Sequence, residues 1–293
     1  MSKTSVCQAG KIDRKKITGP GYDAGILIDN MNRRIKIINY QGLGLASLIQ
    51  RLESLTKERN IGKIIFTCPE EFRFQAEQSD FILEGEIPGF FKGKKALCYS
   101  FYTQRERAKS EFTAKEDKII QEVTCDTDFS PDEIALPGGC QIRQAEQRDV
   151  DKLVSLYREV FVSYPSPLLE PEYVSQVMKE NVYFLVVYKD EELISAGSAE
   201  IDYKNANAEI TDLATSDKAR GMGLATIIIS DLEKEMWQRK LKCLYSLARA
   251  GVPGVNRVFF KLGYQYYGRM TNNCHIGGRY EDMNIWVKGQ SKT

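Results

Sequence analysis

The sequence contains very little histidine and almost no net charge. His275 is the single histidine among 293 residues, and 41 basic against 40 acidic side chains leave a formal net charge of +1. A nucleic-acid-binding protein would show a basic excess or a basic stripe, so we expect no nucleic-acid partner. A site built from several histidines is excluded by their number, and we expect no bound metal.

Long apolar runs and paired cysteines are missing as well. No apolar run approaches the ~18 residues that a membrane-spanning helix needs, and the first residues, "MSKTSVCQAGKIDRKK", lack the apolar core of a signal peptide. The seven cysteines are scattered without a CxxC pair, which argues against a disulfide framework or a zinc knuckle. We therefore expect a cytoplasmic protein with reduced thiols and no membrane contact.

What the sequence does contain is an alternation of β-rich runs and amphipathic segments in three regions. Residues 1–107 form the first region, with one helix at 44–60 and strands at 24–30, 34–40, 62–67 and 95–102. Residues 108–139 are charged and then turn-rich, which is typical of a connector. Residues 140–293 begin with a strand and two helices, continue as a meander of three strands, and end in further helices and strands. This order predicts a mixed sheet with helices packed on it, the α/β class.

Two glycines precede a long helical pattern in "KARGMGLATIIISDLEKE", residues 218–235. A helix N-terminus presents unpaired N–H groups and the positive end of the helix dipole, and glycines let an anion approach that backbone closely. A Walker loop would need GK[ST] after its last glycine, and a Rossmann fingerprint would need an acid after the next strand, which ends "YSLAR". Neither fits, so we expect a pyrophosphate bound after an antiparallel meander.

The same pattern occurs once more, far upstream. "GLGLASLIQRLESLTKERNIGKIIFT" at 42–67 aligns with "GMGLATIIISDLEKEMWQRKLKCLYS" at 221–246 without a gap, glycines included. We interpret residues 1–107 as a partial copy of the second half of the third region. The alternative is a chance resemblance between two strand–helix–strand units.

"AEITDLAT", "KARGMGLA" and "NRVFFKLGYQYYG", taken in this order, resemble the GNAT acetyltransferase superfamily. Its pyrophosphate motif is matched by Lys218, Gly221 and Gly223, with lysine in place of the usual glutamine or arginine. The resemblance implies a mixed, mostly antiparallel sheet in a GNAT domain at 140–293, a partial GNAT-like domain at 1–107, and acetyl-CoA as cosubstrate. The complete chain resembles the β-lysine N-acetyltransferase family.

The resemblance also implies where acetyl-CoA binds. The family's fourth and fifth strands diverge, and the thioester arm lies between them like an added strand. The backbone of Leu213, Ala214 and Thr215 would bond the pantetheine amides, with one N–H group facing the thioester oxygen as it gains charge. Lys218 would add charge beside the pyrophosphate, and Asn256 would contact the pantetheine arm or act as a plain N-cap. The residues expected to surround the pyrophosphate are Arg220, Gly221, Met222, Gly223, Leu224 and Ala225.

Acyl transfer to an amine needs a neutral nucleophile and therefore a base. At neutral pH about one lysine-like amine in a thousand is deprotonated, a deficit of roughly 4 kcal/mol that a carboxylate can partly offset. Glu209 and Asp212 are the two candidates, and in strict β alternation they point to opposite faces unless a bulge intervenes. The family's usual acid, a tyrosine, is replaced here by Phe259, while Tyr264, Tyr266 and Tyr267 are expected to be packing residues.

The expected acceptor is a small amine, β-lysine, converted to the osmolyte N6-acetyl-β-lysine. Its two ammonium groups and one carboxylate need acids and an arginine or a tyrosine hydroxyl. Other acceptors (a protein N-terminus or lysine, a polyamine, an aminoglycoside) and a non-catalytic CoA-binding regulatory module remain alternatives. The half-repeat lacks charge beside its glycines, so we expect it to serve packing or homodimer contacts without binding CoA. Candidate acceptor-binding residues are Tyr164, Glu200, Asp202 and Arg249.

Overall fold

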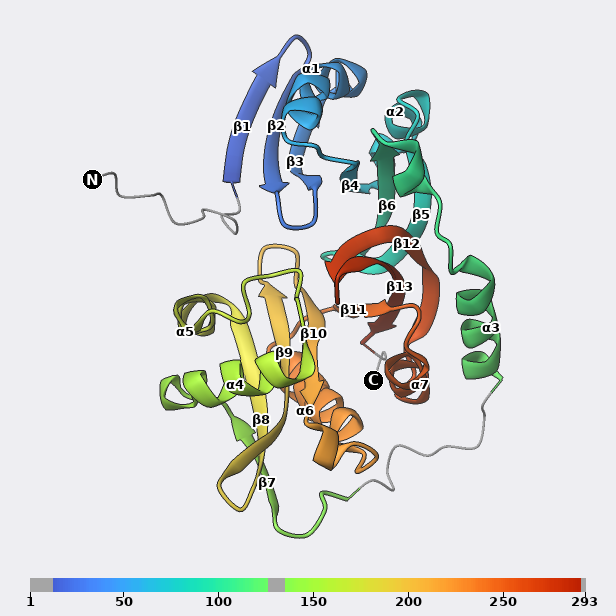
Figure 1. Ribbon diagram of the computed structural model, residues 1–293. Coiled ribbons are helices and arrows are strands. Elements are labelled where there is room, and N and C mark those ends of the chain that lie inside the picture. The colour runs from blue at the N-terminus through green and yellow to red at the C-terminus, as the bar shows by residue number, and fades with distance from the viewer. Residues whose placement is uncertain (1–12, 126–134, 291–293) are drawn as a thin grey trace, which may run out of the picture. The chain divides into compact units, whose positions relative to one another are not determined.

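The computed structural model describes residues 13–125 and 135–290, which cluster into two compact units (Figure 1). The first unit contains the described residues up to Glu84 together with Leu97–Lys109. The second contains Gly85–Ala96 and the described residues from Ser110 onward. A single hairpin, β5–β6, therefore contributes its base to the first unit and its tip to the second.

The first unit is a twisted sheet with one long helix. Its strands follow the spatial order β1-β2-β3-β4-β6, and all neighbours for which a register is given are antiparallel except β3 and β4, which are parallel. Alternate residues of β2, Ala24, Ile26 and Ile28, are fully buried and pack with Leu45 and Leu48 of α1. The elements are β1(Asp13–Gly19), β2(Tyr22–Asp29), β3(Arg34–Gly42), α1(Leu45–Glu58), β4(Lys63–Pro69), α2(Arg73–Gln78), β5(Ile82–Phe91) and β6(Lys94–Tyr102).

The second unit contains the longer sheet, in the order β5-β12-β13-β11-β10-β9-β8-β7. Every neighbouring pair is antiparallel except β10 and β11. This confirms the expected mixed, mostly antiparallel sheet. The elements are α3(Thr113–Thr124), β7(Cys140–Gln144), α4(Val150–Val160), α5(Pro171–Glu180), β8(Val182–Lys189), β9(Glu192–Asp202), β10(Asn207–Thr215), α6(Leu224–Gln238), β11(Cys243–Arg249), α7(Pro253–Lys261), β12(Gln265–Ile276) and β13(Arg279–Gly289).

Helices cover both faces of this sheet, each over its own apolar cluster. On one face α4 and α5 pack over Phe184, Val186 and Ala196. On the other face α6 and α7 enclose residues such as Ile210 and Trp286. The segment expected as a connector is not wholly irregular, because it contains α3, whose Ile119 and Val123 join the α6–α7 cluster.

The connectivity of the first unit repeats that of the second. A helix links parallel neighbours in both, α1 between β3 and β4 and α6 between β10 and β11. The strand order β2-β3-β4-β6-β5 corresponds to β9-β10-β11-β13-β12. The internal similarity seen in the sequence thus has a counterpart in the strand order of the two units.

Candidate active site

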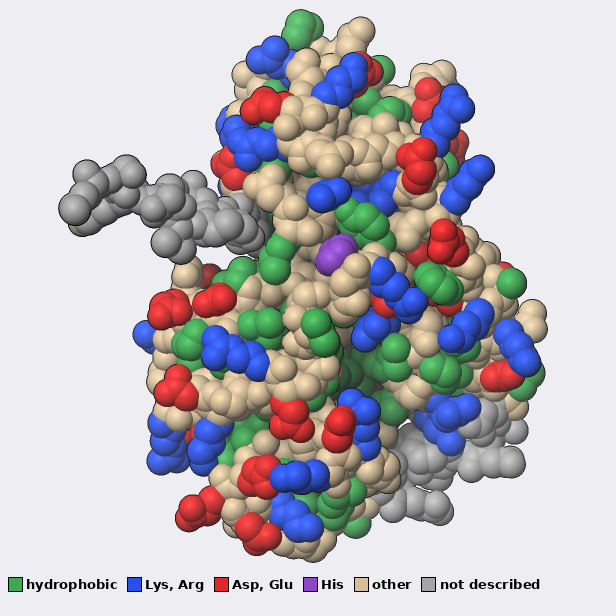
Figure 2. Space-filling view, viewed as in Figure 1, with side chains coloured by type: hydrophobic (Ala, Val, Ile, Leu, Met, Phe, Trp, Pro, Cys, Tyr) green, Lys and Arg blue, Asp and Glu red, His purple; other side chains and the backbone are tan. Residues whose placement is uncertain are grey.

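The sheet opens between β10 and β11. The two strands pair over only three positions, Asn207–Glu209 with Cys243–Tyr245. Beyond that point β10 continues along β9 as far as Thr215, while β11 continues along β13 as far as Arg249. The strands therefore diverge after the Glu209–Tyr245 pair and leave facing backbone edges that a strand-like ligand can occupy. Figure 2 shows apolar side chains lining a hollow in the surface of this unit.

A β-bulge lies on β10 where the strands separate. Thr211 pairs with Ser198 and Ala214 with Ala196, so β10 carries one more residue than β9 over this interval. The additional residue is accommodated at Asp212, whose backbone adopts a positive φ of 53°. Its carboxylate accepts hydrogen bonds from Ser198 Oγ at 2.6 Å and from Tyr164 Oη at 2.9 Å. The bulge therefore places Asp212 on the same face as Glu209, and the strict alternation that would separate them does not hold.

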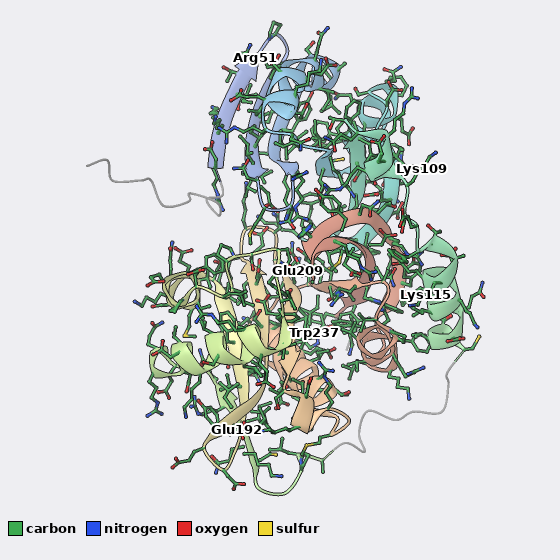
Figure 3. All side chains as sticks on the ribbon, viewed as in Figure 1. Arg51, Lys109, Lys115, Glu192, Glu209 and Trp237 are labelled. Carbon is green, nitrogen blue, oxygen red and sulfur yellow. The ribbon has the colours of Figure 1, made fainter. Side chains whose placement is uncertain are left out.

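Acidic and aromatic side chains form a row across the sheet beside this opening. Glu200, Glu209 and Tyr245 are register neighbours on β9, β10 and β11 and so share one face. Burial raises the pKa of Tyr245 well above its ordinary value, and the nearby charges of Glu209 and Glu200 raise it further. Tyr173 of α5 has a raised pKa as well, through burial first and then through Glu200 and Asp212. Figure 3 labels Glu209 on β10, at the opposite end of the sheet from Glu192.

The glycine turn has the geometry of an anion site. Gly221 and Gly223 adopt φ of 81° and 74°, values that strongly favour glycine, and α6 begins at Leu224. Within the described residues, no backbone carbonyl accepts from the N–H groups of positions 221 and 223–226. A Cβ built on Gly221 meets nothing within 4 Å, so a ligand has room to approach.

Two cations lie beside the turn and remain in solvent. The side chains of Lys218 and Arg220 are 84% and 63% exposed. Lys218 Nζ is 3.9 Å from Glu192 and Arg220 Nη2 is 2.8 Å from Asp217. Exposed ion pairs of this kind contribute little to stability, so both cations can be redirected to a bound anion at small cost.

Residues 150–264 match the model of the Acetyltransferase (GNAT) family. The β-lysine N(6)-acetyltransferase of Methanosarcina mazei is 36% identical, over 81% of this chain and 94% of its own. N-acetyltransferase YodP of Bacillus subtilis is 33% identical, over 94% of this chain and 98% of its own. The β-lysine N(6)-acetyltransferase of Methanococcus maripaludis is 28% identical, over 91% and 96% respectively. This chain belongs to the GNAT family.

The chain is therefore an acyltransferase of the acetyl-CoA-dependent N-acetyltransferase type. The diverging strands β10 and β11 and the glycine turn before α6 all lie within the matched residues 150–264. No helix in the described parts of the chain is long and apolar enough to cross a membrane.

Asn256, which was expected to contact pantetheine, already has protein partners for its side-chain amide. Asn256 Nδ2 donates to the carbonyls of Arg249 and Val252, while its Oδ1 accepts from Asn284 Nδ2 and Trp286 Nε1. Because these four bonds use the whole capacity of an amide, the Asn256 side chain has none left for pantetheine. Its position ties α7 to β11 and β13.

Two of the acceptor candidates are held in similar ways. Asp202 accepts hydrogen bonds from the backbone N–H and the Nδ2 of Asn205, at 3.0 and 2.7 Å, and so shapes the β9–β10 turn. Arg249 Nη2 lies 2.9 Å from the buried Glu281, with one third of the Arg249 side chain exposed. Of the four acceptor candidates, Tyr164 contacts Asp212 and Glu200 lies opposite Glu209, whereas the charged groups of Asp202 and Arg249 already bond to Asn205 and Glu281.

The pantetheine candidates line the β10 side of the opening. Ala214 is buried and its carbonyl accepts from Ser195 Oγ at 3.0 Å, while Thr215 Oγ1 lies 2.7 Å from the same hydroxyl. Leu213 packs against the apolar cluster under α6. These side chains hold β10 in place, and its pairing with β11 has already ended at Glu209.

Phe259, at the usual GNAT tyrosine position, is fully buried and packs edge-on against Tyr264 at 5.0 Å between ring centroids. Tyr264 is itself buried and Tyr266 packs against Trp286, as expected of packing residues. Neither Phe259 nor the buried Tyr264 is placed to donate a proton at the cleft.

Sequence reasoning did not identify Tyr245, Tyr173 and Ser198 as site residues. Tyr245 and Ser198 are spaced by even numbers of residues from the candidate residues of their own strands, and this spacing could have placed them on the same face. Their neighbours, however, depend on the register between strands far apart in the chain, which the alternation does not contain.

Proposed function

We propose that this GNAT enzyme transfers the acetyl group of acetyl-CoA to the N6 amine of L-β-lysine, producing N6-acetyl-β-lysine. The observation that carries the proposal is the position of Glu209 at the point where β10 and β11 separate, with Glu200 opposite it. Carboxylates gathered there favour a substrate that brings more than one ammonium group. Two relatives that are named β-lysine N(6)-acetyltransferase support the same acceptor.

Acetyl-CoA is proposed to bind along the diverging strands. Its pyrophosphate would lie in the turn of residues 220–225 and accept hydrogen bonds from the N–H groups of residues 221 and 223–225, with Lys218 and Arg220 adding positive charge. The pantetheine arm would pair with the backbone of residues 213–215. This places the thioester near Glu209, where a backbone N–H of β10 can stabilise the developing oxyanion.

The chemistry is direct attack by a neutral amine. Glu209, the base we favour, accepts a proton from the acceptor ammonium, and the amine nitrogen then bonds to the thioester carbon. Collapse of the tetrahedral intermediate breaks the C–S bond and releases CoA as the thiolate. The nitrogen then carries one proton more than the amide, and this proton passes to the departing thiolate or to solvent as the amide forms. With Phe259 in place of the usual tyrosine, the thiolate departs without a tyrosine acid.

Asp212 is better suited to positioning than to proton transfer. Burial raises its pKa, although hydrogen bonds from Ser198 and Tyr164 counteract part of the increase. Two hydroxyl groups already occupy the carboxylate, and Tyr164 belongs to the segment between α4 and α5. We therefore propose that Asp212 holds this segment over the acceptor.

The product has the charge expected of an osmolyte. β-Lysine carries two ammonium groups and one carboxylate at neutral pH, and acetylation of one amine leaves a net-neutral zwitterion. A solute without net charge can accumulate without disturbing electrostatic interactions by screening. Arg249, whose guanidinium is shared with Glu281 but partly exposed, is the candidate partner for the acceptor carboxylate.

The test is product mass spectrometry after offering β-lysine, α-lysine and spermidine with acetyl-CoA. We expect β-lysine to gain one acetyl group, which fragmentation should locate at N6. Release of the CoA thiol should depend on β-lysine. Preferred use of spermidine or α-lysine would refute the acceptor. Tight CoA binding without thiol release for any amine would instead indicate a non-catalytic CoA-binding module. The absence of the usual tyrosine, replaced here by Phe259, is consistent with that alternative.

A further inference from the structure

The tip of the β5–β6 hairpin is fixed to the start of β10. Asn207 Nδ2 donates to the carbonyl of Phe90 at 2.8 Å, and the N–H of Lys92 donates to the carbonyl of Asn205 at 2.8 Å. Asn207 is buried, so its amide would lose a necessary partner without the hairpin. These bonds lie within the second unit, to which residues 85–96 belong.

The same tip also reaches the first residues of β11. The Phe90 ring packs against the Tyr245 ring with centroids 5.5 Å apart and planes inclined at 56°. Gly89 has φ of 84°, and a Cβ at that position would lie 3.2 Å from Cys243 Cβ. Close approach and left-handed backbone together require glycine there. The hairpin is thus fitted to the two strand ends immediately before they diverge.

Tyr245 is placed between this hairpin and the carboxylates. Its register neighbour on β10 is Glu209, and Glu200 follows on β9, while Phe90 contacts its ring. An aromatic face beside two carboxylates attracts an ammonium group by both cation–π and Coulomb interactions. The orientation of the Tyr245 ring therefore controls half of such a site, and Phe90 is the side chain that packs against it.

We propose that the β5–β6 hairpin tip determines acceptor specificity, with Phe90 as a positioning residue that holds Tyr245 beside Glu209 and Glu200. The ligand is the ammonium group of an aliphatic diamine. This inference rests on the proposed function for the location of the acceptor. It gives a hairpin of the N-terminal half-repeat a role at the catalytic end of the sheet.

The test is steady-state kinetics of Phe90→Ala in the full chain, with β-lysine, α-lysine, spermidine and 1,5-diaminopentane as acceptors. For the acceptor that the wild type uses best, we expect KM to rise about tenfold, with kcat and the acetyl-CoA KM changing less than about twofold, because an aromatic contact to the cation site is lost. Phe90→Tyr should restore the acceptor KM. Phe74→Ala, at a 68% exposed phenylalanine of α2, is the matched control and should leave both KM values unchanged.

An unchanged acceptor KM in Phe90→Ala, or an equal rise in both KM values, would overturn the proposal. Failure of the β-lysine assignment is separate, because it appears in the wild type as preference for another amine. If no amine is turned over, calorimetric titration of each with the CoA-saturated protein replaces kinetics. In that case the inference is contradicted if the wild type and Phe90→Ala bind the amine with equal affinity. It is also contradicted if neither protein binds any of the amines.

Discussion

Replacing Gly221 by glutamate should abolish or strongly weaken CoA binding by placing an anion where the pyrophosphate is expected. The site has space for the side chain, since nothing lies within 4 Å of the built Cβ. The backbone at φ of 81° is strained for any residue with a Cβ, at about 1–2 kcal/mol of folding free energy. The effect of charge must therefore be separated from that of strain.

A series of three variants makes this separation. Gly221→Ala introduces the strain alone, Gly221→Gln adds bulk, and Gly221→Glu adds the charge. Two unit charges about 4 Å apart repel by about 1 kcal/mol in water-like surroundings and about 4 kcal/mol at an effective dielectric constant of about 20. The Kd of the glutamate variant for CoA should therefore exceed that of the glutamine variant by about fivefold to several hundredfold.

Gly263 provides the matched control. It has φ of 84°, its built Cβ also meets nothing within 4 Å, and it follows α7, away from the start of α6. Gly263→Glu should lower the melting temperature about as much as Gly221→Glu and leave the Kd for CoA unchanged. Both quantities come from differential scanning fluorimetry and isothermal calorimetry.

Salt provides a second criterion. Raising the ionic strength from about 0.05 M to about 0.5 M shortens the screening distance, so the difference between Gly221→Glu and Gly221→Gln should shrink. Equal CoA affinities for the two variants at low salt would refute the placement of the pyrophosphate at this turn. The assignment of residues 213–215 to the pantetheine arm would then lose its support as well.

Three further changes test other parts of the site and the second unit. Glu209→Gln should lower kcat/KM by about 10²- to 10⁴-fold and leave the Kd for CoA unchanged. If Asp212→Asn lowers kcat/KM more than Glu209→Gln does, Asp212 is the base instead. Asp212→Asn should cost about 1–3 kcal/mol in a denaturant titration, because an amide cannot accept from both Ser198 and Tyr164 as the carboxylate does. Burial, with help from Asp282, raises the pKa of Glu116 to about 8 from an unfolded value of 4.5, so its contribution to stability is complete below about pH 4.5 and is lost as the pH rises through 8. Glu116→Gln should therefore lose less melting temperature between pH 6 and pH 9 than the wild type, and identical losses would contradict the assignment.

Strong periodicity made most of the fold predictable from the sequence. The helix at α4 and the meander β8–β9–β10 have regular apolar spacing, and both are present where that spacing places them. Two strands were not expected. β1, "DRKKITG", is a mostly polar edge strand, and β5, "ILEGEIPGFF", contains two glycines and a proline, so neither shows a clear alternation.

The glycine turn was the most predictable part of the candidate site, because backbone conformation there depends on local residues. Gly221 and Gly223 both have positive φ, as the motif requires. Contacts between strands were not predictable in the same way. Neither the full set of bonds on Asn256 nor the ion pair between Arg249 and Glu281 follows from residue spacing, since the partners lie about 30 positions away in the chain.

The bulge at Asp212 links the two halves of the site. A regular β10 would keep its ladder with β9 in step and turn Asp212 to the α6 face, which is lined with apolar residues. The additional residue places the carboxylate under Tyr164, so the segment between α4 and α5 is fastened to the same strand that borders the opening. Bulges also increase local twist, which helps β10 depart from β11 after only three paired positions. One irregularity in the strand thus serves both the gap proposed for the thioester and the position of the segment proposed to cover the acceptor.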